Sequence, residues 1–330
     1  MSFKKQIFNM AKQDVKTIVF PEAGFSDKII EAVRIATQKK LAKAILLGDE
    51  SALYLRYSAL ADENIQIINP KTSELRNLFI EEICELRKSK GVTKEECEKM
   101  LEDPIYFATM MVKDGYADGM VSGTESFSAS TFKPALQLIK GVLPNKLVSS
   151  SMLVFIKKGL FKVRPILISD CALVENPTKE NLVEIAKNSV DFWKMLFYSE
   201  PKVAFLSYST KGSAKSESIA KMRSGTDLFK KTYPEVVADG ELQIDVALSK
   251  KACKAKNYIG QINGEANILI VPDINSGSLL VKALHSVAGY TCIGPVAQGF
   301  ARPVNDVTRN ASINEIVMLI AITVIQAQLY

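Results

Sequence analysis

Histidine is nearly missing from this chain: of its 330 residues, only His285 is a histidine. A Ser-His-Asp or Cys-His mechanism would therefore have to run through that one side chain. His285 lies in LLVKALHSVAGY, a segment with a helical pattern, where a structural role is the more common one. Proton transfer is expected instead from a carboxylate, lysine, tyrosine or cysteine.

Cysteine is also sparse, and its spacing excludes the usual cysteine frameworks. The five cysteines form no C-x-x-C pair and lie far apart in the sequence, at Cys84, Cys97, Cys171, Cys253 and Cys292. This spacing argues against a disulfide framework and against a zinc site. We expect buried, unreactive thiols and no metal centre.

Long hydrophobic runs are lacking as well. The longest, Ile316 to Ala327, is interrupted by Thr323 and Gln326 and is shorter than the roughly 20 residues that a membrane-spanning helix needs. The first twenty residues contain lysines but no continuous apolar core and no small-residue cleavage site. We therefore expect no secretory signal and a cytoplasmic location.

Neither sign of charge dominates this chain. The chain has 42 basic and 36 acidic residues, a net charge of +6, without a long Lys/Arg run. This balance favours small phosphorylated ligands over nucleic acid.

The motifs that bind nucleotides are missing. Ser209 to Lys215 (STKGSAK) does not have P-loop spacing, and no G-x-G-x-x-G occurs in a βαβ context. This disfavours nucleoside triphosphate and dinucleotide sites.

The regular pattern that is present indicates an α/β fold. Hydrophobic residues make up 47% of the chain, and its length suits about two domains. Short β-branched runs alternate with helical patterns, which is typical of a largely parallel sheet covered by helices. The predicted strands are Thr17 to Pro21, Ala44 to Gly48, Ala117 to Gly123, Pro165 to Asp170, Lys202 to Ser207 and Asn267 to Asp273.

Helices are predicted between these strands from apolar spacing and from start and stop signals. They are Asp27 to Lys40, Thr72 to Lys90 with Gly91 at C′, a short helix capped by Thr93 and Glu96, one starting at Asp103-Pro104 and ending near Gly115, PALQLIKGVL from Pro134, Pro177 to Met195, and Ser312 to Gln328. The strand pattern restarts near Val148. It predicts one domain from 1–147 plus 297–330, with the last helix returning to it, and a second domain from 148–296.

A hydroxyl-rich segment, Thr124 to Phe132 (TESFSASTF), follows the third predicted strand and is expected to be a loop that ends at Lys133-Pro134. Its hydroxyls could cap the next helix, or they could donate to a phosphate. Ligands of open α/β sheets bind at the carboxyl ends of the strands, which favours the second interpretation. Ser128 and Thr131 are the candidate donors.

A second candidate segment is Gly294 to Ile316, which is predicted to be a loop opening the last apolar helix. It contains Arg302, Arg309, Thr308 and Glu315. Guanidinium groups, backbone amides and the positive end of a helix dipole suit an anionic substrate.

Each of these side chains also has a structural alternative. Arg309 could pair with Asp306, and Ser312-x-x-Glu315 fits a capping box in which Glu315 bonds back to the Ser312 amide. Arg87 lies in the last turn of a predicted helix, where a basic side chain often complements the dipole. The residues alone leave these alternatives open.

Taken together, these segments resemble the phosphate acetyltransferase (phosphotransacetylase) family. The likeness covers nearly the whole chain and is carried by ADGMVSG…PALQLIK, SDCALVENPT, LSYSTKGSAK, DGELQIDVAL, NILIVPDINSG and GPVAQGFARPVNDVTRNASINEIV…AITVIQAQ. It implies two three-layer α/β/α domains separated by a cleft, and a homodimer. It also implies reversible transfer of acetyl between coenzyme A and phosphate, with acetyl-CoA, phosphate and acetyl phosphate as substrates and no tightly bound cofactor.

The resemblance also implies roles for individual residues. The serine-arginine pair of the family falls on Thr308 and Arg309, and its catalytic aspartate falls on Glu315. Its two arginines that bind coenzyme A fall on Arg87 and Lys133. By this likeness Glu315 would remove the thiol proton, while Arg309 and Thr308 would hold the phosphoryl oxygens and the developing oxyanion.

Four positions depart from the family pattern. Thr308 replaces serine but keeps a hydroxyl, and Glu315 replaces aspartate but keeps a carboxylate. Lys133 replaces arginine, keeping the charge and losing the bidentate fork, which predicts altered coenzyme A binding. Ser126 stands where the family commonly has histidine.

Three alternatives remain beside an acetyltransferase. The acyl pocket is not readable from sequence, so a preference for butyryl or another acyl group stays open. The four departures motivate a non-catalytic protein that binds coenzyme A or acetyl phosphate. A nicotinamide-dependent dehydrogenase of similar build is disfavoured by the missing dinucleotide fingerprint.

Overall fold

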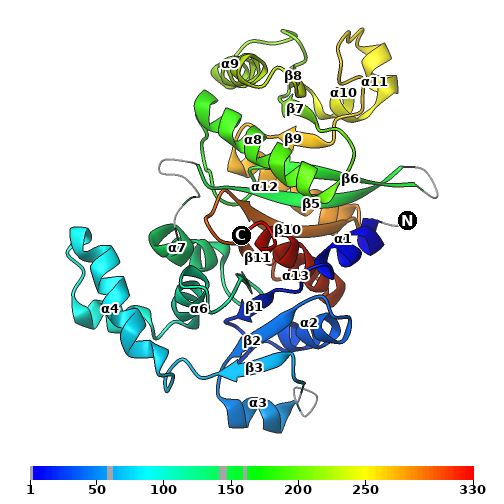
Figure 1. Cartoon of the computed structure of the whole chain (residues 1–330). Helices are drawn as coiled ribbons and strands as arrows, with labels where there is room; N and C mark the ends of the chain where they lie inside the picture. Colours follow the sequence, from blue (N-terminus) through cyan, green and yellow to red (C-terminus); the bar gives the residue numbers. More distant parts are fainter. Residues whose placement is uncertain (1–2, 58–61, 140, 142–146, 159–161) are drawn as a thin grey trace. The chain divides into compact units, whose positions relative to one another are not determined.

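The chain forms two compact units, seen in the computed structural model in Figure 1. The structure describes residues 3–57, 62–139, 141, 147–158 and 162–330. One unit comprises Met1–Pro144 together with Phe300–Tyr330, and the other comprises Asn145–Gly299. The first unit is therefore assembled from both ends of the chain. The fold is α/β with mostly parallel sheets, as predicted.

The first unit is built on a parallel sheet with the strand order β11-β4-β1-β2-β3. Buried β-branched and leucine side chains explain the strands, since both faces of the sheet are covered. The strands are β1 (Thr17–Phe20), β2 (Lys43–Leu47), β3 (Ile65–Ile68), β4 (Gly119–Ser122) and β11 (Val304–Asp306).

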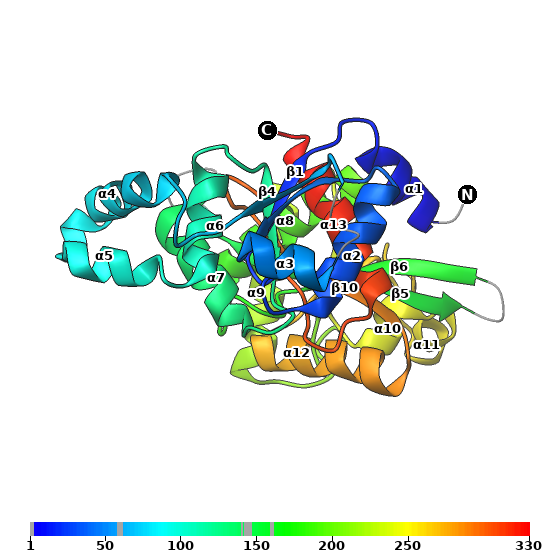
Figure 2. The same ribbon diagram turned by 90° about the horizontal axis from the view of Figure 1, so that it is seen from below.

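Helices cover both faces of this sheet. α2 and α13 contact it on one face, and α6 and α7 on the other (Figures 1 and 2). The helices are α1 (Phe3–Ala11), α2 (Asp27–Gln38), α3 (Glu50–Arg56), α4 (Leu75–Arg87), the 3₁₀ turn η2 (Lys88–Lys90), α5 (Lys94–Met100), α6 (Pro104–Lys113), α7 (Ser128–Leu138) and α13 (Ile313–Ala327).

The last helix, α13, is the centre of the first unit. Its sequence is apolar around most of its circumference, and twelve of its fifteen residues are buried. It contacts α1, α2, β1, β4 and β11. A helix that is hydrophobic on nearly all sides belongs in a core. Among the described residues, no helix combines the length and apolarity that a membrane span requires.

The second unit has a mixed sheet with the order β10-β5-β6-β9-β7-β8. β5 pairs antiparallel with both β10 and β6, and the remaining pairs are parallel. The strands are β5 (Ser149–Lys158), β6 (Lys162–Ser169), β7 (Lys202–Leu206), β8 (Val237–Leu242), β9 (Ile268–Ile270) and β10 (Thr291–Gln298). Its helices are α8 (Lys179–Leu196), α9 (Glu217–Thr232), α10 (Ile244–Leu248), α11 (Lys250–Ala255), α12 (Ile274–Lys282) and the π-helical turn η3 (Ala283–Val287).

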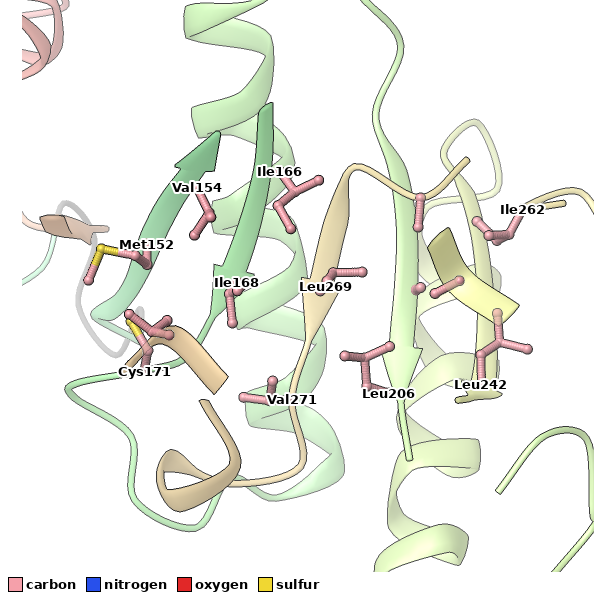
Figure 3. Close-up of a cluster of buried hydrophobic side chains, with 14 of the residues drawn as sticks. Met152, Val154, Ile166, Ile168, Cys171, Leu206, Leu242, Ile262, Leu269 and Val271 are labelled. Carbon is pink, nitrogen blue, oxygen red and sulfur yellow. The ribbon is translucent and has the colours of Figure 1, made fainter. Parts of the chain in front are cut away.

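Figure 3 shows the core of the second unit. Side chains from neighbouring strands, among them Ile168, Leu269 and Leu206, pack against apolar residues of α10, α11 and α12. α8 contacts β5, β6, β9 and β10, and α9 contacts β7 and β8. His285 lies in η3, within the helical segment predicted for it.

Most element predictions are confirmed, with shifts of a few residues. The capping box of Thr93 and Glu96, the helix start at Asp103-Pro104 and the left-handed Gly91 after η2 are all present. The predicted strand Ala117 to Gly123 is shorter, as β4. Strands β3, β5, β8, β10 and β11 were not predicted, because their segments are short or mix polar and apolar residues.

Three local predictions were wrong. Thr124 to Phe132 is not all loop: α7 begins at Ser128, so Pro134 lies inside the helix. Pro177 precedes the α8 cap at Thr178 instead of opening the helix. Gly294 to Ile316 is not a continuous loop, since it contains the end of β10 and all of β11. In the first two cases a proline was read as a first-turn residue.

The fold brings together two cysteines that the sequence separates. Cys84 on α4 and Cys97 on α5 place their Sγ atoms 2.6 Å apart. Cys97, Cys171, Cys253 and Cys292 are buried, as predicted, and Cys84 is half-buried. Burial raises the pKa of the Cys97 thiol to about 12, which suppresses its thiolate form.

Candidate functional site

The candidate site is built at the carboxyl end of the first unit's sheet, where β11 ends at Asp306. β11 runs parallel to β4, with Asp306 opposite Ser122. The Asp306 carboxylate is almost fully buried, at 1% exposure. Its Oδ1 accepts a hydrogen bond of 2.9 Å from the Thr131 hydroxyl, and its Oδ2 accepts one from the Ser128 hydroxyl. Both hydroxyls come from the first turn of α7.

Asp306 is held in this position at a high electrostatic cost. Burial is the main cause that raises the pKa of its carboxyl, to about 7, and the negative charge of Glu22 raises it further. The hydrogen bonds from Ser128 and Thr131 act in the opposite direction. A buried carboxyl whose pKa is shifted this far is more common at functional sites than elsewhere.

Gly123 makes room for this carboxyl. A Cβ on Gly123 would lie 2.0 Å from Asp306 Oδ1 and 2.7 Å from the Val307 carbonyl oxygen, and the residue has a φ of +104°. Only glycine combines that backbone conformation with so close an approach. The glycine at the end of β4 is thus explained by the carboxyl at the end of β11.

Glu22 orders the loop between β4 and α7. This carboxylate is fully buried and accepts hydrogen bonds from the backbone amides of Gly123, Thr124, Glu125 and Ser126, at 2.8 to 3.3 Å. The Thr124 hydroxyl also donates to it, at 2.8 Å. These five hydrogen bonds tie the loop to one buried side chain. The loop therefore delivers Ser128 to the start of α7 in one fixed conformation.

Arg309 lies over the beginning of α7. Its guanidinium carbon is 4.4 Å from the centroid of the Phe127 ring, and Phe127 is the N-cap residue of α7. Lys28 of α2 donates to the Arg309 carbonyl oxygen at 2.8 Å. No ion pair joins Arg309 to Asp306 among the described residues; the Asp306 carboxylate is bonded to Ser128 and Thr131, and the Arg309 guanidinium lies over Phe127. Arg309, Ser128 and the amino end of α7 are thus adjacent.

Thr308 and Glu315 lie on either side of the turn into α13. Thr308 is half-buried, and its carbonyl oxygen accepts a hydrogen bond of 2.8 Å from Ala311. Glu315 is mostly buried, and its Oε2 accepts hydrogen bonds of 2.8 Å from both the amide and the hydroxyl of Ser312. The capping box anticipated as an alternative role for Glu315 is therefore present.

Arg87 and Lys133 lie on α4 and α7. The Nε atom of Arg87 is buried, and within the described part of the chain it has no hydrogen-bond partner. Its charge acts on Tyr106 of α6, whose hydroxyl donates to Gln137 of α7 at 2.9 Å. Lys133 is exposed, about one helical turn before Gln137. A buried guanidinium N–H without a protein acceptor is rare in a native structure, where such groups bond to an ordered water or ion or have a catalytic role.

The structure does not bring Arg302 to this group. Arg302 precedes β11, at the amino end of the sheet, where its guanidinium lies 5.7 Å from the centre of the Tyr330 ring. Its charge also acts on Lys16, which directly precedes β1. The carboxyl ends of the strands, where Asp306 and Arg309 lie, are at the opposite end.

Sequence reasoning missed four residues that shape the site, namely Asp306 as a bonding partner of α7, Glu22, Gly123 and Phe127. A signal existed for Asp306, because a polar Asn-Asp pair follows a short apolar run before Thr308. Glu22 lies about a hundred residues before the loop it holds, so only the fold reveals its role. Among the described residues, no group of three or more His, Cys, Asp or Glu side chains is placed to hold a metal ion.

Comparison with known proteins bears on what this site does. Residues 2–324 match the family described as phosphate acetyl/butaryl transferase. The chain belongs to this family. It is 40% identical over 330 residues to the phosphate acetyltransferase of Acetivibrio thermocellus, covering 99% of both chains.

Solved structures show the same family relationship. A phosphotransacetylase from Streptococcus pyogenes superposes with a TM-score of 0.89 at 33% identity, over 100% of both chains. A branched-chain phosphotransacylase from Enterococcus faecalis V583 reaches a TM-score of 0.69 at 22% identity, over 94% of this chain and 99% of that one. The second likeness concerns the fold alone.

Proposed function

We propose that this protein is an acyltransferase that moves an acetyl group reversibly between coenzyme A and inorganic phosphate. The observation that supports this most directly is the grouping of Arg309, the Ser128 hydroxyl and the amino end of α7. A guanidinium, a hydroxyl and a helix N-terminus together make an anion site. Membership of the phosphate acetyl/butaryl transferase family supports phosphate as the anion.

In this proposal the phosphoryl group lies between α7 and the turn after β11. Arg309 neutralises its oxygens and the charge that builds on the carbonyl oxygen in the tetrahedral intermediate. The Thr308 hydroxyl is a further donor, and Ser128 and Thr131 form the wall on the α7 side. Donors fixed in this way are effective because they need no reorganisation as charge develops.

Glu315 is the proposed general base. A free thiol has a pKa near ~8.5, so little of coenzyme A is thiolate at neutral pH. A carboxylate within hydrogen-bond reach of the sulfur can accept the proton as attack on acetyl phosphate proceeds. In this proposal Glu315 keeps its capping bonds to Ser312, both of which are accepted by Oε2.

Arg87 and Lys133 are the proposed contacts for coenzyme A, whose phosphates would supply the acceptor that the buried Arg87 Nε lacks. Arg302 is left out of the proposed site because it lies at the amino end of the sheet.

We also propose the two-domain division 1–147 plus 297–330 and 148–296, a homodimer, a cytoplasmic location, and turnover without a tightly bound cofactor.

Measuring acetyl phosphate formation from acetyl-CoA and phosphate tests this function. Parallel assays with propionyl-CoA and butyryl-CoA determine the acyl preference, because the family description names both acetyl and butaryl transfer. Turnover with any of these thioesters supports the proposal. Binding of coenzyme A without turnover would instead identify a non-catalytic binding protein.

A further inference from the structure

The Asp306 carboxylate limits what the two hydroxyls of α7 can do. An ionised carboxylate only accepts hydrogen bonds, so Ser128 and Thr131 must both direct their hydrogens at Asp306. Their oxygens then present lone pairs to the surroundings. A phosphate oxygen that approaches Ser128 would meet an acceptor and no donor.

Protonation of Asp306 reverses one of these bonds. A neutral carboxylic acid has one O–H, which can donate to the Ser128 oxygen and release the Ser128 hydrogen. The released hydrogen can point outward, because Ser128 is only half-buried and lies at the open end of α7. Thr131 is fully buried and continues to donate to Oδ1. The anion site gains a donor when Asp306 gains a proton.

The surroundings of Asp306 favour such a change over permanent ionisation. The elements packed against β11 are β4, α7 and α13. β4 carries no charged side chain, α7 carries the exposed Lys133, and α13 carries Glu315, which is bonded to Ser312. Glu22, in the loop after β1, adds negative charge that disfavours a second carboxylate. Arg309, the nearest cation along the chain, lies over Phe127.

We propose that Asp306 is a positioning residue that sets the direction of the Ser128 hydroxyl hydrogen, so that binding of a phosphate-like dianion at α7 is coupled to uptake of one proton by Asp306. The inference rests on the proposed function, because it takes the α7 hydroxyls as part of the phosphate site. It adds a proton-linked control of that site which requires no movement of the backbone.

Sulfate is a suitable probe, since it remains a dianion across the range in which Asp306 titrates. We expect sulfate to bind the wild-type protein about tenfold or more weakly on the alkaline side of neutrality than on the acidic side, because one hydrogen bond to a charged group is lost. Calorimetry in buffers of different ionisation enthalpy should show uptake of up to one proton per sulfate on the alkaline side.

Asp306→Asn mimics the protonated carboxyl, because its amide nitrogen can donate to Ser128 while its oxygen accepts from Thr131. This variant should bind sulfate tightly and almost independently of pH, without proton uptake. Asp118→Asn is the matched control, since Asp118 accepts from the Thr17 amide at 2.8 Å at the opposite end of the same sheet. It should keep the pH dependence of the wild type.

Two further outcomes separate this inference from the proposed function. If Ser128→Ala leaves sulfate affinity unchanged on the acidic side of neutrality, the Ser128 hydroxyl does not form the anion site and the proposed substrate site is wrong. If it weakens binding there, but wild-type affinity is independent of pH or no proton is taken up, the site stands and the role of Asp306 is wrong. The wild-type calorimetry decides this even if Asp306→Asn fails to fold.

Discussion

The Glu315 carboxylate accepts two hydrogen bonds from Ser312, one from its amide and one from its hydroxyl, each 2.8 Å long. The side chain proposed as the catalytic base is thus also the N3 residue of the α13 capping box. The cap fixes the rotamer of Glu315 before any substrate binds. A base that is already oriented loses less conformational entropy in the transition state.

Exchanging Glu315 for glutamine separates these two roles. Glutamine can complete a capping box, so Glu315→Gln should change the free energy of unfolding by less than ~1 kcal/mol. Loss of the base should lower kcat by about 10² to 10⁴ and remove the pH limb that reports thiol deprotonation. Ser312→Ala is the control: it weakens the cap, costing ~1 kcal/mol of stability, and keeps that limb. If the Glu315→Gln enzyme keeps the wild-type pH profile, Glu315 is only a capping residue of α13 and is not the general base.

Replacing Arg309 by alanine should remove most activity and leave the fold intact. One preorganised donor to a developing oxyanion is commonly worth ~3 to 4 kcal/mol, so kcat/KM should fall by two to three orders of magnitude. Arg309→Lys should recover only part of this, because lysine lacks the planar fork. Arg34→Ala, which removes an ion pair with Glu31 on α2, controls for loss of surface charge. Near wild-type turnover of Arg309→Ala would exclude Arg309 from the mechanism.

Two substitutions at the proposed coenzyme A contacts, Arg87→Ala and Lys133→Arg, should change the KM for coenzyme A in opposite directions. Arg87→Ala should raise the KM for coenzyme A about tenfold or more, since a charge-assisted hydrogen bond to phosphate is lost. Lys133→Arg should lower that KM, because it restores a bidentate fork. Lys88→Ala, which removes an exposed neighbour paired with Glu85, is the control for Arg87. If the KM for coenzyme A is unchanged in both Arg87→Ala and Lys133→Arg, coenzyme A does not bind at these two residues.

The buried Asp306 predicts a pH dependence of stability. Its folded pKa, about 7, lies above its ordinary value of 3.8, so the folded state holds a proton that the unfolded state has lost. This contribution lowers the free energy of unfolding by up to about 1.4 kcal/mol per pH unit, from about pH 4 to about pH 7. Asp306→Asn removes the effect and should be more stable relative to wild type on the alkaline side than on the acidic side. Urea unfolding at both ends of this range measures it; a constant difference would mean that Asp306 does not change protonation on unfolding.

Sequence patterns predicted the elements whose apolar residues recur at strand or helix spacing. Strands β1, β2 and β7 and helices α2, α8 and α13 were found because their apolar residues follow a clear period. The start of α7 was missed, since Pro134 looked like a helix start and the preceding serines and threonines looked like a loop. Tertiary contacts decide that region: Glu22 fixes the loop, and Asp306 bonds the first turn of the helix.

The candidate site was predictable only where one segment carries it. Thr308, Arg309 and Glu315 lie within eight residues of one another and were found together. Glu22 accepts a hydrogen bond from Gly123 across 101 residues of sequence, and Asp306 accepts one from Ser128 across 178. No local pattern predicts such pairs. Arg302 was included because it shares the segment, and β11 carries it to the other end of the sheet.

The dependence of the first unit on its last helix has a consequence for biosynthesis. α13 provides the centre of that unit, and the Gln328 side chain donates to the carbonyl oxygens of Met10, Ala11 and Asp14. The second unit is one continuous stretch and can complete its core while the ribosome is still translating. The amino-terminal segment of the first unit can complete its core only after α13 has been synthesised. The second unit can therefore fold before the first, and removal of α13 would expose the apolar surfaces of α1, α2, β1 and β4 that it contacts.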